Sequence, residues 1–246
     1  MNPGVTVRHC RGIAELTACV DAQRRVWGEV DLEVIPATCF IVAEHSGGQV
    51  LGAFDGSKMV GFTLATPAMR DGQTYLHSQM TAVLENYRDQ NIGRRLKLFQ
   101  REDALARGIR LIEWTFDPLE TRNAHFNLDR LGAIARKLVR NMYGITSSPL
   151  HRGLPTDRLV AEWHLDSPRV ADLVAGRAPS LPGATAEVVL LQNIDALKAN
   201  CHDEISRIQA HLSSKLEECF KRGYAATATS SAPEGFQYVL QPWIQN

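Results

Sequence analysis

The chain has 246 residues with 27 basic and 27 acidic side chains, so its formal net charge is zero. This length is enough to bury a sizeable core, as one large domain or two small ones. The balanced charge excludes a global attraction to nucleic acid or to an anionic membrane.

No apolar run approaches the roughly 20 residues that a membrane-spanning helix needs. The first ten residues also lack the apolar core of a signal peptide. We therefore expect a cytoplasmic protein without a nucleic-acid or membrane partner. The five cysteines are odd in number, and no two of them form a Cys-x-x-Cys pair. This pattern predicts reduced thiols rather than a disulfide framework, and it predicts no metal site.

In the first half of the chain, hydrophobic periodicity alternates between the strand and helix repeats. Asp55-Gly56 stands between two apolar runs, which is typical of a hairpin turn. Gly28 and Gly108 are placed to end helices. The expected strands are Thr6–Arg8, Val50–Phe54, Met59–Ala65, Thr74–Val83 and Arg110–Phe116, and the expected helices are Ile13–Trp27 and about 91–107.

The second half predicts a helix at about 122–131, ended by Gly132, and then strands at Ala133–Met142 and Leu159–Leu165. Residues 167–187 are rich in Pro, Gly and Ala, so we expect a linker there. Beyond it we expect a short strand at Val188–Leu191, an amphipathic helix at Ile205–Arg222 and a hairpin. The order of these elements predicts an α/β (α+β) fold, with a mixed sheet flanked by helices.

The segment from Val83 to Arg95 carries the clearest chemical pattern. A strand ends at Val83, the chain turns, and a helix begins at about Asn91. The first amides of a helix have no internal partner and lie at the positive end of its dipole, so a pyrophosphate fits there. Gly93 has no Cβ and allows close approach to the backbone. Arg88 and Arg94 can add charge-assisted hydrogen bonds.

This segment resembles the acyl-CoA loop of the GNAT acyltransferase superfamily. The family pattern is Arg or Gln, two residues, Gly, one residue, and then Gly or Ala. Arg88 matches the first position and Gly93 the last, and Asn91 stands where the middle Gly is usual. Trp114–Leu119 and Arg122–Asn127 further resemble an uncharacterised bacterial and archaeal branch of that superfamily.

The resemblance implies a GNAT fold, whose central sheet is mixed and mainly antiparallel. It implies a GNAT core at residues 1–166, a linker at 167–187, and a C-terminal helix-hairpin extension at 188–246. The extension would pack on the core or form a homodimer contact. The resemblance also implies that a backbone N–H near Val83 polarises the thioester carbonyl. The residues implied in acyl-CoA binding are Ala82, Val83, Arg88, Gln90, Asn91, Ile92, Gly93, Arg94, Arg95 and Asn123.

The usual proton-transfer residues of the family are replaced in this chain. Gln79 stands where many relatives carry a Glu base, and Leu128 where many carry a Tyr acid. His77 is the substitute base we consider first, because strict alternation places it on one strand face with Gln79; a structural histidine is the alternative. Asp117 acting through a water and Tyr143 as an acid are the further candidates. Trp27 and Gln79 are candidate substrate contacts.

We therefore expect an acyltransferase that moves an acyl group, acetyl first, from acyl-CoA to the amine of a small molecule such as an amino acid. Succinyl-CoA or another short acyl-CoA is the alternative donor. An alternative from a different functional class is a non-catalytic acyl-CoA sensor, because both usual proton-transfer residues are missing.

Overall fold

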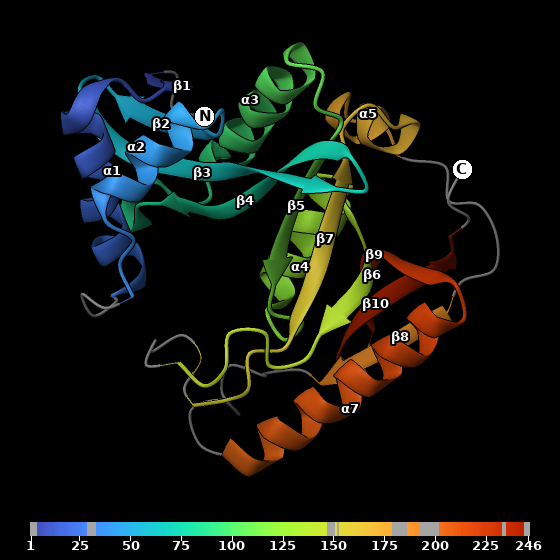
Figure 1. Ribbon diagram of the computed structural model, residues 1–246. Coiled ribbons are helices and arrows are strands. Elements are labelled where there is room, and N and C mark those ends of the chain that lie inside the picture. The colour runs from blue at the N-terminus through green and yellow to red at the C-terminus, as the bar shows by residue number, and fades with distance from the viewer. Residues whose placement is uncertain are drawn as a thin grey trace. The chain divides into compact units, whose positions relative to one another are not determined.

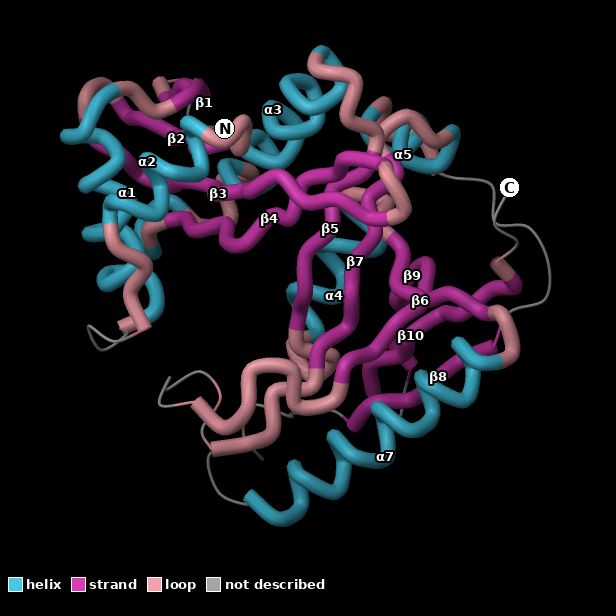
Figure 2. The backbone as a smooth tube through the Cα atoms, viewed as in Figure 1, coloured by secondary structure: helices cyan, strands magenta, loops and turns pink. Residues whose placement is uncertain are grey.

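The computed structural model describes residues 4–28, 33–146, 151, 153–178, 186–191, 202–232 and 235–243. These residues form two compact units, one up to Glu113 and one from Trp114 onward. Figure 1 labels the elements, and Figure 2 traces the backbone through them. The division falls within a strand, whereas the sequence predicts a domain boundary after residue 166, which stays a prediction.

The first unit is a sheet with helices on both faces. Its elements are β1 (Val5–His9), α1 (Gly12–Trp27), α2 (Ala37–His45), β2 (Gln49–Asp55), β3 (Lys58–Arg70), β4 (Gln73–Val83), the 3-10 turn η1 (Glu85–Tyr87), α3 (Ile92–Ala106) and the first half of β5 (Leu111–Phe116). The strands follow the order β1-β2-β3-β4-β5. Neighbours are antiparallel except β4 and β5, which are parallel. This confirms the predicted mixed, mainly antiparallel sheet.

Two hydrophobic clusters hold the helices to opposite faces of this sheet. On one face, α1 and α2 pack on Phe62 and Leu64 of β3, and Phe40 of α2 is fully buried there. On the other face, Ile92 and Leu96 of α3 pack on apolar residues of β1 to β3. The N-terminal end of α3 is therefore fixed by buried side chains next to the end of β4.

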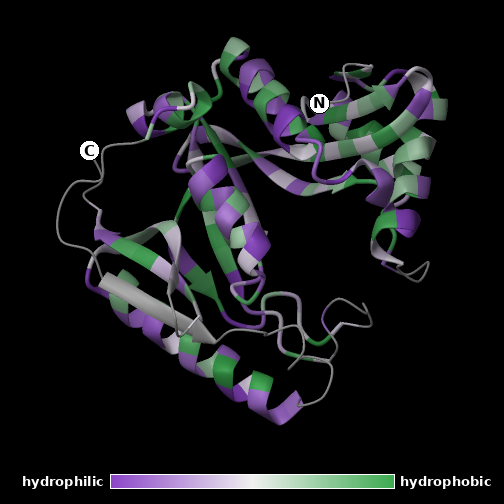
Figure 3. Cartoon of the chain, turned by 180° about the vertical axis from the view of Figure 1, so that it is seen from behind, coloured by the Kyte–Doolittle hydropathy of each residue, from purple (hydrophilic) through white to green (hydrophobic). Residues whose placement is uncertain are grey.

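The second unit joins the rest of β5 to a second group of strands. Its other elements are α4 (Thr121–His125), η2 (Phe126–Arg130), β6 (Ile134–Val139), β7 (Arg158–His164), α5 (Pro168–Val174), β8 (Ala186–Leu191), α7 (His202–Lys221), β9 (Tyr224–Ala232) and β10 (Gly235–Pro242). The strand order is β5-β7-β6-β9-β10-β8. The predicted C-terminal helix and hairpin are thus present as α7, β9 and β10. Figure 3 shows the amphipathic pattern of α7, which buries Ile205, Leu212 and Leu216.

Three local expectations need correction. The helix expected at 122–131 is a short α-helix, α4, that continues as a π-helical turn, η2, in which the Leu131 amide donates to Phe126 O at 3.1 Å. The expected linker contains helix α5, which begins with Pro168 and is capped by Ser167. Helix α2 was not expected, because apolar residues lie all round it and Val42 is 64% exposed.

Among the described residues, no helix is long and apolar enough to cross a membrane.

Candidate functional site

One edge of strand β4 has a strand partner in its own unit over only a short stretch. Its ladder with β5 consists of Leu76 opposite Ile112 and His77 opposite Glu113. From residue 78 to Val83, β4 continues within the first unit paired with β3 alone.

Two backbone amides point toward that edge. The Leu84 amide donates to Val60 O of β3 at 2.9 Å. Successive N–H groups of a strand alternate between its two edges, so those of Thr81 and Val83 point away from β3. These amides fit the role that the sequence assigned to a donor near Val83.

The loop after β4 brings the chain into α3 through two left-handed residues, Asp89 at φ 59° and Asn91 at φ 61°. Asn91 stands just before the helix, and its side chain makes no capping hydrogen bond. Asparagine tolerates this backbone region better than most residues. The substitution of Asn for the family's middle Gly is therefore compatible with the turn.

The first turn of α3 is electrostatically unusual. It contains Arg94 and Arg95 and no acidic residue, although the positive end of a helix dipole favours negative side chains. Arg95 is directed to β1, where its guanidinium donates to Val5 O at 2.5 Å. A helix start with cations and no cap is stabilised by an anion, so this end is suited to a pyrophosphate.

Gly93 leaves the backbone of this helix start bare. Its φ is not positive, and a Cβ built on it meets only Val83 Cγ2, at 3.8 Å. The chain's own packing therefore leaves room for a side chain at this position. The absence of one opens the helix backbone to close approach by a phosphate, so the residues present fit the diphosphate of an acyl-CoA.

The other residues implied in acyl-CoA binding differ in what they expose. The Arg88 side chain is exposed, with Nε 3.4 Å from Val83 O, and Gln90 donates to Asn86 O at 3.0 Å. The side chains of Ala82 and Ile92 are buried, so each can offer a ligand only its backbone. Asn123 is exposed on α4, in the other unit.

A cavity of about 530 Å³ lies between α2 and the sheet. Its wall on the strands is formed by Thr66 of β3 and Gln79 of β4. Gln79 is a bulge residue, because Leu64 pairs with Met80 and Ala65 with Ser78. The lining residues described are Glu33, Val34, Ile35, Pro36, Thr38, Cys39, Val42, Ala43, Ser46, Thr66 and Gln79. Among them Glu33 carries the only charged side chain.

The buried side chain of Gln23 in α1 holds one wall of this cavity in place. Its amide donates to Ile35 O at 3.0 Å and accepts from the Ile35 amide at 2.9 Å. We expect Gln23→Ala to destabilise the protein by about 1–3 kcal/mol, because two half-buried backbone groups of Ile35 lose their partner. Thermal unfolding measures this change.

The same variant should raise the KM for the acceptor and leave the Kd for CoA unchanged, since α3 is not touched. Gln209→Ala is the matched control, because Gln209 also donates from a buried side chain to a backbone oxygen, that of Pro155, at 2.8 Å in the other unit. An equal rise in acceptor KM in both variants would contradict a specific role of Gln23 in the cavity.

His77 lies on the cavity side of the sheet. It stands opposite Thr66 in the ladder between β3 and β4, and Gln79 approaches Thr66 Oγ1 at 3.5 Å. Residues opposite one another in a ladder share a face. Burial lowers the pKa of His77, Glu113 raises it and Lys97 lowers it, so the neutral imidazole is favoured near neutral pH.

Lys97 of α3 is buried beneath β4. Its ammonium group donates to Gln100 Oε1 at 2.6 Å and to Ser78 Oγ at 3.2 Å. Burial lowers the pKa of Lys97 from 10.5 to about 7. Ser78 is itself buried.

The shift in Lys97 predicts how stability depends on pH. Between pH 7 and 10.5 the unfolded chain holds a proton that the folded protein lacks, so the free energy of unfolding rises by up to about 1.4 kcal/mol per pH unit. Urea unfolding should therefore show that Lys97→Met raises the free energy of unfolding most, relative to the unaltered protein, at pH 6. The two proteins should converge toward pH 10. Lys137→Met at an exposed position is the control and should show no such trend.

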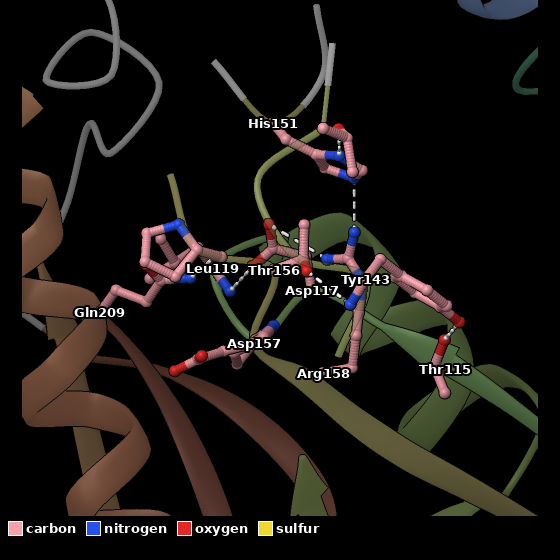
Figure 4. Close-up of polar contacts among 12 residues, drawn as sticks. Thr115, Asp117, Leu119, Tyr143, His151, Thr156, Asp157, Arg158 and Gln209 are labelled. Atoms are coloured by element: carbon pink, nitrogen blue, oxygen red, sulfur yellow. Dashed lines mark hydrogen bonds and ion pairs between the residues drawn. The ribbon is translucent and has the colours of Figure 1, made fainter. Parts of the chain in front are cut away.

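The remaining catalytic candidates lie in the second unit (Figure 4). Tyr143 is 49% exposed, and its hydroxyl lies 2.8 Å from Thr115 Oγ1. Asp117 accepts from the Leu119 amide at 2.8 Å and lies 3.6 Å from Arg158. Asp117 thus caps a turn and pairs with an arginine. Neither residue belongs to the same unit as His77. Their catalytic roles stay predictions.

The departures from the family pattern are visible in the structure. Leu128 is fully buried, so no acidic side chain stands at that position. Trp27 packs edge-on against Phe62 at 6.3 Å and does not line the cavity. Residues 29–31, which follow it in the sequence, lie outside the described residues. Four charged residues around the cavity and His77 were not identified from the sequence: Glu33, Arg70, Lys97 and Glu113.

Comparisons with known proteins agree with this geometry. Residues 16–132 match the family model for the acetyltransferase (GNAT) family. These residues therefore form a GNAT superfamily domain, as the sequence predicts. Among curated proteins, no relative matches the chain.

Similar solved structures share the fold at low identity. The ribosomal-protein-S18-alanine N-acetyltransferase of Escherichia coli has a TM-score of 0.53 at 15% identity, covering 66% of this chain and 95% of that one. A GNAT family acetyltransferase from Elizabethkingia anophelis with acetyl-CoA bound has a TM-score of 0.51 at 14% identity, over 66% and 99%. Naa50 of Arabidopsis thaliana, in complex with a bisubstrate analogue, has 0.50 at 15%, over 65% and 97%.

Proposed function

We propose that the protein is an acyl-CoA-dependent N-acyltransferase that acetylates a small amine. The single observation that carries this proposal is the start of α3, which has no side-chain cap, two arginines in its first turn and a bare Gly93. The acetyl-CoA bound to the similar Elizabethkingia anophelis structure supports acetyl-CoA as the donor. Succinyl-CoA is the second candidate donor.

Acyl-CoA would supply the activated acyl group as a thioester. The amides of α3 and the exposed Arg88 hold the diphosphate, and the Thr81 and Val83 N–H groups stabilise negative charge on the carbonyl oxygen. His77 takes the proton of the attacking amine. The C–N bond of the amide forms, the C–S bond of the thioester breaks, and CoA leaves as its thiolate. The neutral state of His77 favoured by burial is the state that this step needs.

The cavity beside Gln79 supports an amine with an apolar body as the acceptor. Its walls are mainly apolar, and Glu33 is the one charged group among the described lining residues. A carboxylate there favours an ammonium group and disfavours an acidic acceptor. The amino acid suggested by the sequence would need a cation for its carboxylate. Arg8, a cation of the first unit, is held by Glu15 at 2.7 and 2.8 Å.

Isothermal titration with acetyl-CoA, succinyl-CoA and free CoA tests the proposal. We expect acetyl-CoA to bind with micromolar affinity, and we expect turnover with apolar primary amines in a thiol-release assay. Absence of heat and of a thermal shift at millimolar acetyl-CoA would overturn the proposal. Binding without turnover over a broad amine panel would instead indicate a sensor. Sedimentation at two concentrations tests the predicted homodimer.

A further inference from the structure

A buried polar cluster joins helix α3 to strand β4 on the face of the sheet away from the cavity. Lys97 and Gln100 of α3 and Ser78 of β4 are each at most 4% exposed. Ser78 Oγ accepts from Lys97 Nζ at 3.2 Å and lies 3.4 Å from Gln100 Nε2. Lys97 also donates to Gln100 Oε1 at 2.6 Å. Two side chains of the helix thus hold one hydroxyl of the strand.

Ser78 lies next to the bulge in β4. Gln79 is the bulge residue and has no partner of its own in the ladder with β3. A bulge locally disrupts the ladder and bends the strand, so fewer backbone hydrogen bonds fix this part of β4 than a regular stretch. The neighbours of Ser78 in the chain are His77, the proposed base, and Gln79, which lines the cavity.

The burial of Lys97 is not explained by stability. Transfer of an ammonium group from water into the protein interior is unfavourable, and apolar side chains of similar volume often stabilise a protein when they replace buried charges. Helix α3 is also held to the sheet by Ile92 and Leu96, which pack in an apolar cluster. Natural proteins break such packing rules mainly at functional sites, so a lysine beneath the bulge indicates a functional requirement there.

We propose that Lys97 is a positioning residue for His77 and Gln79. From α3 its side chain holds Ser78 on one face of β4, and it thereby fixes the backbone that carries the base and the bulge residue. The same helix begins at the turn proposed to bind the diphosphate, so the cluster also fixes the base relative to bound acyl-CoA. This inference rests on the proposed function, because it gives the base and the acceptor cavity of that reaction a common support.

Lys97→Met tests the inference, because methionine has a side chain of similar length that cannot donate. In urea unfolding at pH 6 we expect the variant to have a higher midpoint than the unaltered protein, as the cost of the buried charge is removed. Amide hydrogen exchange of residues 76–82 should nonetheless become about 10-fold faster. Mass spectrometry of β4 peptides measures this exchange. A role in stability alone would move global stability and local protection in the same direction.

The rate of turnover gives the second measurement. It is compared on the plateau of the kcat profile, where His77 is neutral, so that the effect of the Lys97 charge on the His77 pKa does not contribute. We expect Lys97→Met to lower kcat about 10- to 100-fold, because the base is displaced from the acceptor amine. The Kd for acetyl-CoA should stay the same, since the start of α3 is unaltered. Lys97→Gln keeps a donor and should retain more of the kcat.

Gln49→Met is the matched control. Gln49 is buried in β2 and donates to Gln100 O at 3.0 Å and to Asp103 Oδ2 at 2.7 Å. It therefore also joins α3 to a strand, but that strand is not β4. This variant should have a lower urea midpoint, with kcat and the exchange of residues 76–82 unchanged.

Ser78→Ala removes the strand's half of the contact and should show the same loss of kcat as Lys97→Met. The double variant Lys97→Met/Ser78→Ala should be no slower than either single variant, because both changes break one interaction. If Lys97→Met fails to fold, Ser78→Ala provides the test by itself.

Unchanged exchange of residues 76–82, or an unchanged kcat, in folded Lys97→Met and Ser78→Ala would overturn the inference. An equal loss of kcat in Gln49→Met would also overturn it, because weaker anchoring of α3 would then explain the effect. Hydrogen exchange needs no turnover, and CoA titration on the same samples tests the proposed function separately. Faster exchange in a protein that binds no acetyl-CoA would reject the acyltransferase and keep the support of β4 by Lys97.

Discussion

Gly93→Val is expected to raise the Kd for acetyl-CoA by at least about 100-fold, equivalent to about 2.7 kcal/mol, while the protein stays folded. A branched side chain at the second helical position covers the amides that would face the diphosphate. We expect the fold to tolerate the change, since the added Cβ meets only Val83 Cγ2 at 3.8 Å. Glycine is also the poorest ordinary residue in a helix, so its replacement does not weaken α3.

Isothermal titration and thermal unfolding of the same samples measure the two effects. Gly93→Ala should give a smaller loss of affinity, because a methyl group covers less of the backbone. Ala106→Val is the matched control: it adds the same side chain at an exposed position at the other end of α3, and its Kd should not change. Equal affinity in Gly93→Val and the unaltered protein would place the diphosphate elsewhere.

The parts of the site that the sequence predicted are local in the chain. Val83 to Gly93 is one continuous segment, and the sequence shows its strand end, its turn residues and its glycine directly. The helix start at Ile92 was predicted within one residue. The positions of β2 and β4 were also predicted, because Asp55-Gly56 and Asp71-Gly72 mark turns beside them. The start of β3 was predicted within one residue, but the strand ends at Arg70 and not at Ala65.

The parts that it did not predict depend on long-range pairing. The sequence placed His77 and Gln79 on one face by strict alternation, but the bulge at Gln79 interrupts that alternation. Both residues nonetheless lie beside Thr66 of β3. The pair of Arg70 and Glu113 joins residues 43 positions apart. A glutamate within an apolar strand indicates a buried polar group, but only the sheet order shows which cation pairs with it.

Helix α2 was missed for a different physical reason. Pattern reading detects a helix by the contrast between an apolar and a polar face, and α2 lacks that contrast because Val42 is exposed while Phe40 and Ala43 are buried. Since α2 forms much of the cavity wall, this cavity could not be predicted from the sequence.

The second large effect is expected from His77→Gln, which should lower kcat about 100- to 1,000-fold and leave the Kd for acetyl-CoA unchanged. Glutamine keeps the polarity of the position but cannot accept the amine's proton. In the unaltered protein only the neutral imidazole is active, so kcat rises with pH through the pKa of His77 and then reaches a plateau. Because burial lowers that pKa below its ordinary 6.5, the plateau should begin at a more acidic pH than for an exposed histidine.

The pH profile of kcat separates catalysis from structure. In His77→Gln the acid limb should disappear, and the residual rate should depend on the ionisation of the acceptor amine alone. His125→Gln is the control, since the exposed His125 pairs with Asp129 at 3.1 Å in the other unit, and its profile should match that of the unaltered protein. An acid limb that persists in His77→Gln would assign the proton transfer to another group. Tyr143→Phe and Asp117→Asn would then be the variants to compare, because those two residues are the remaining candidates for proton transfer.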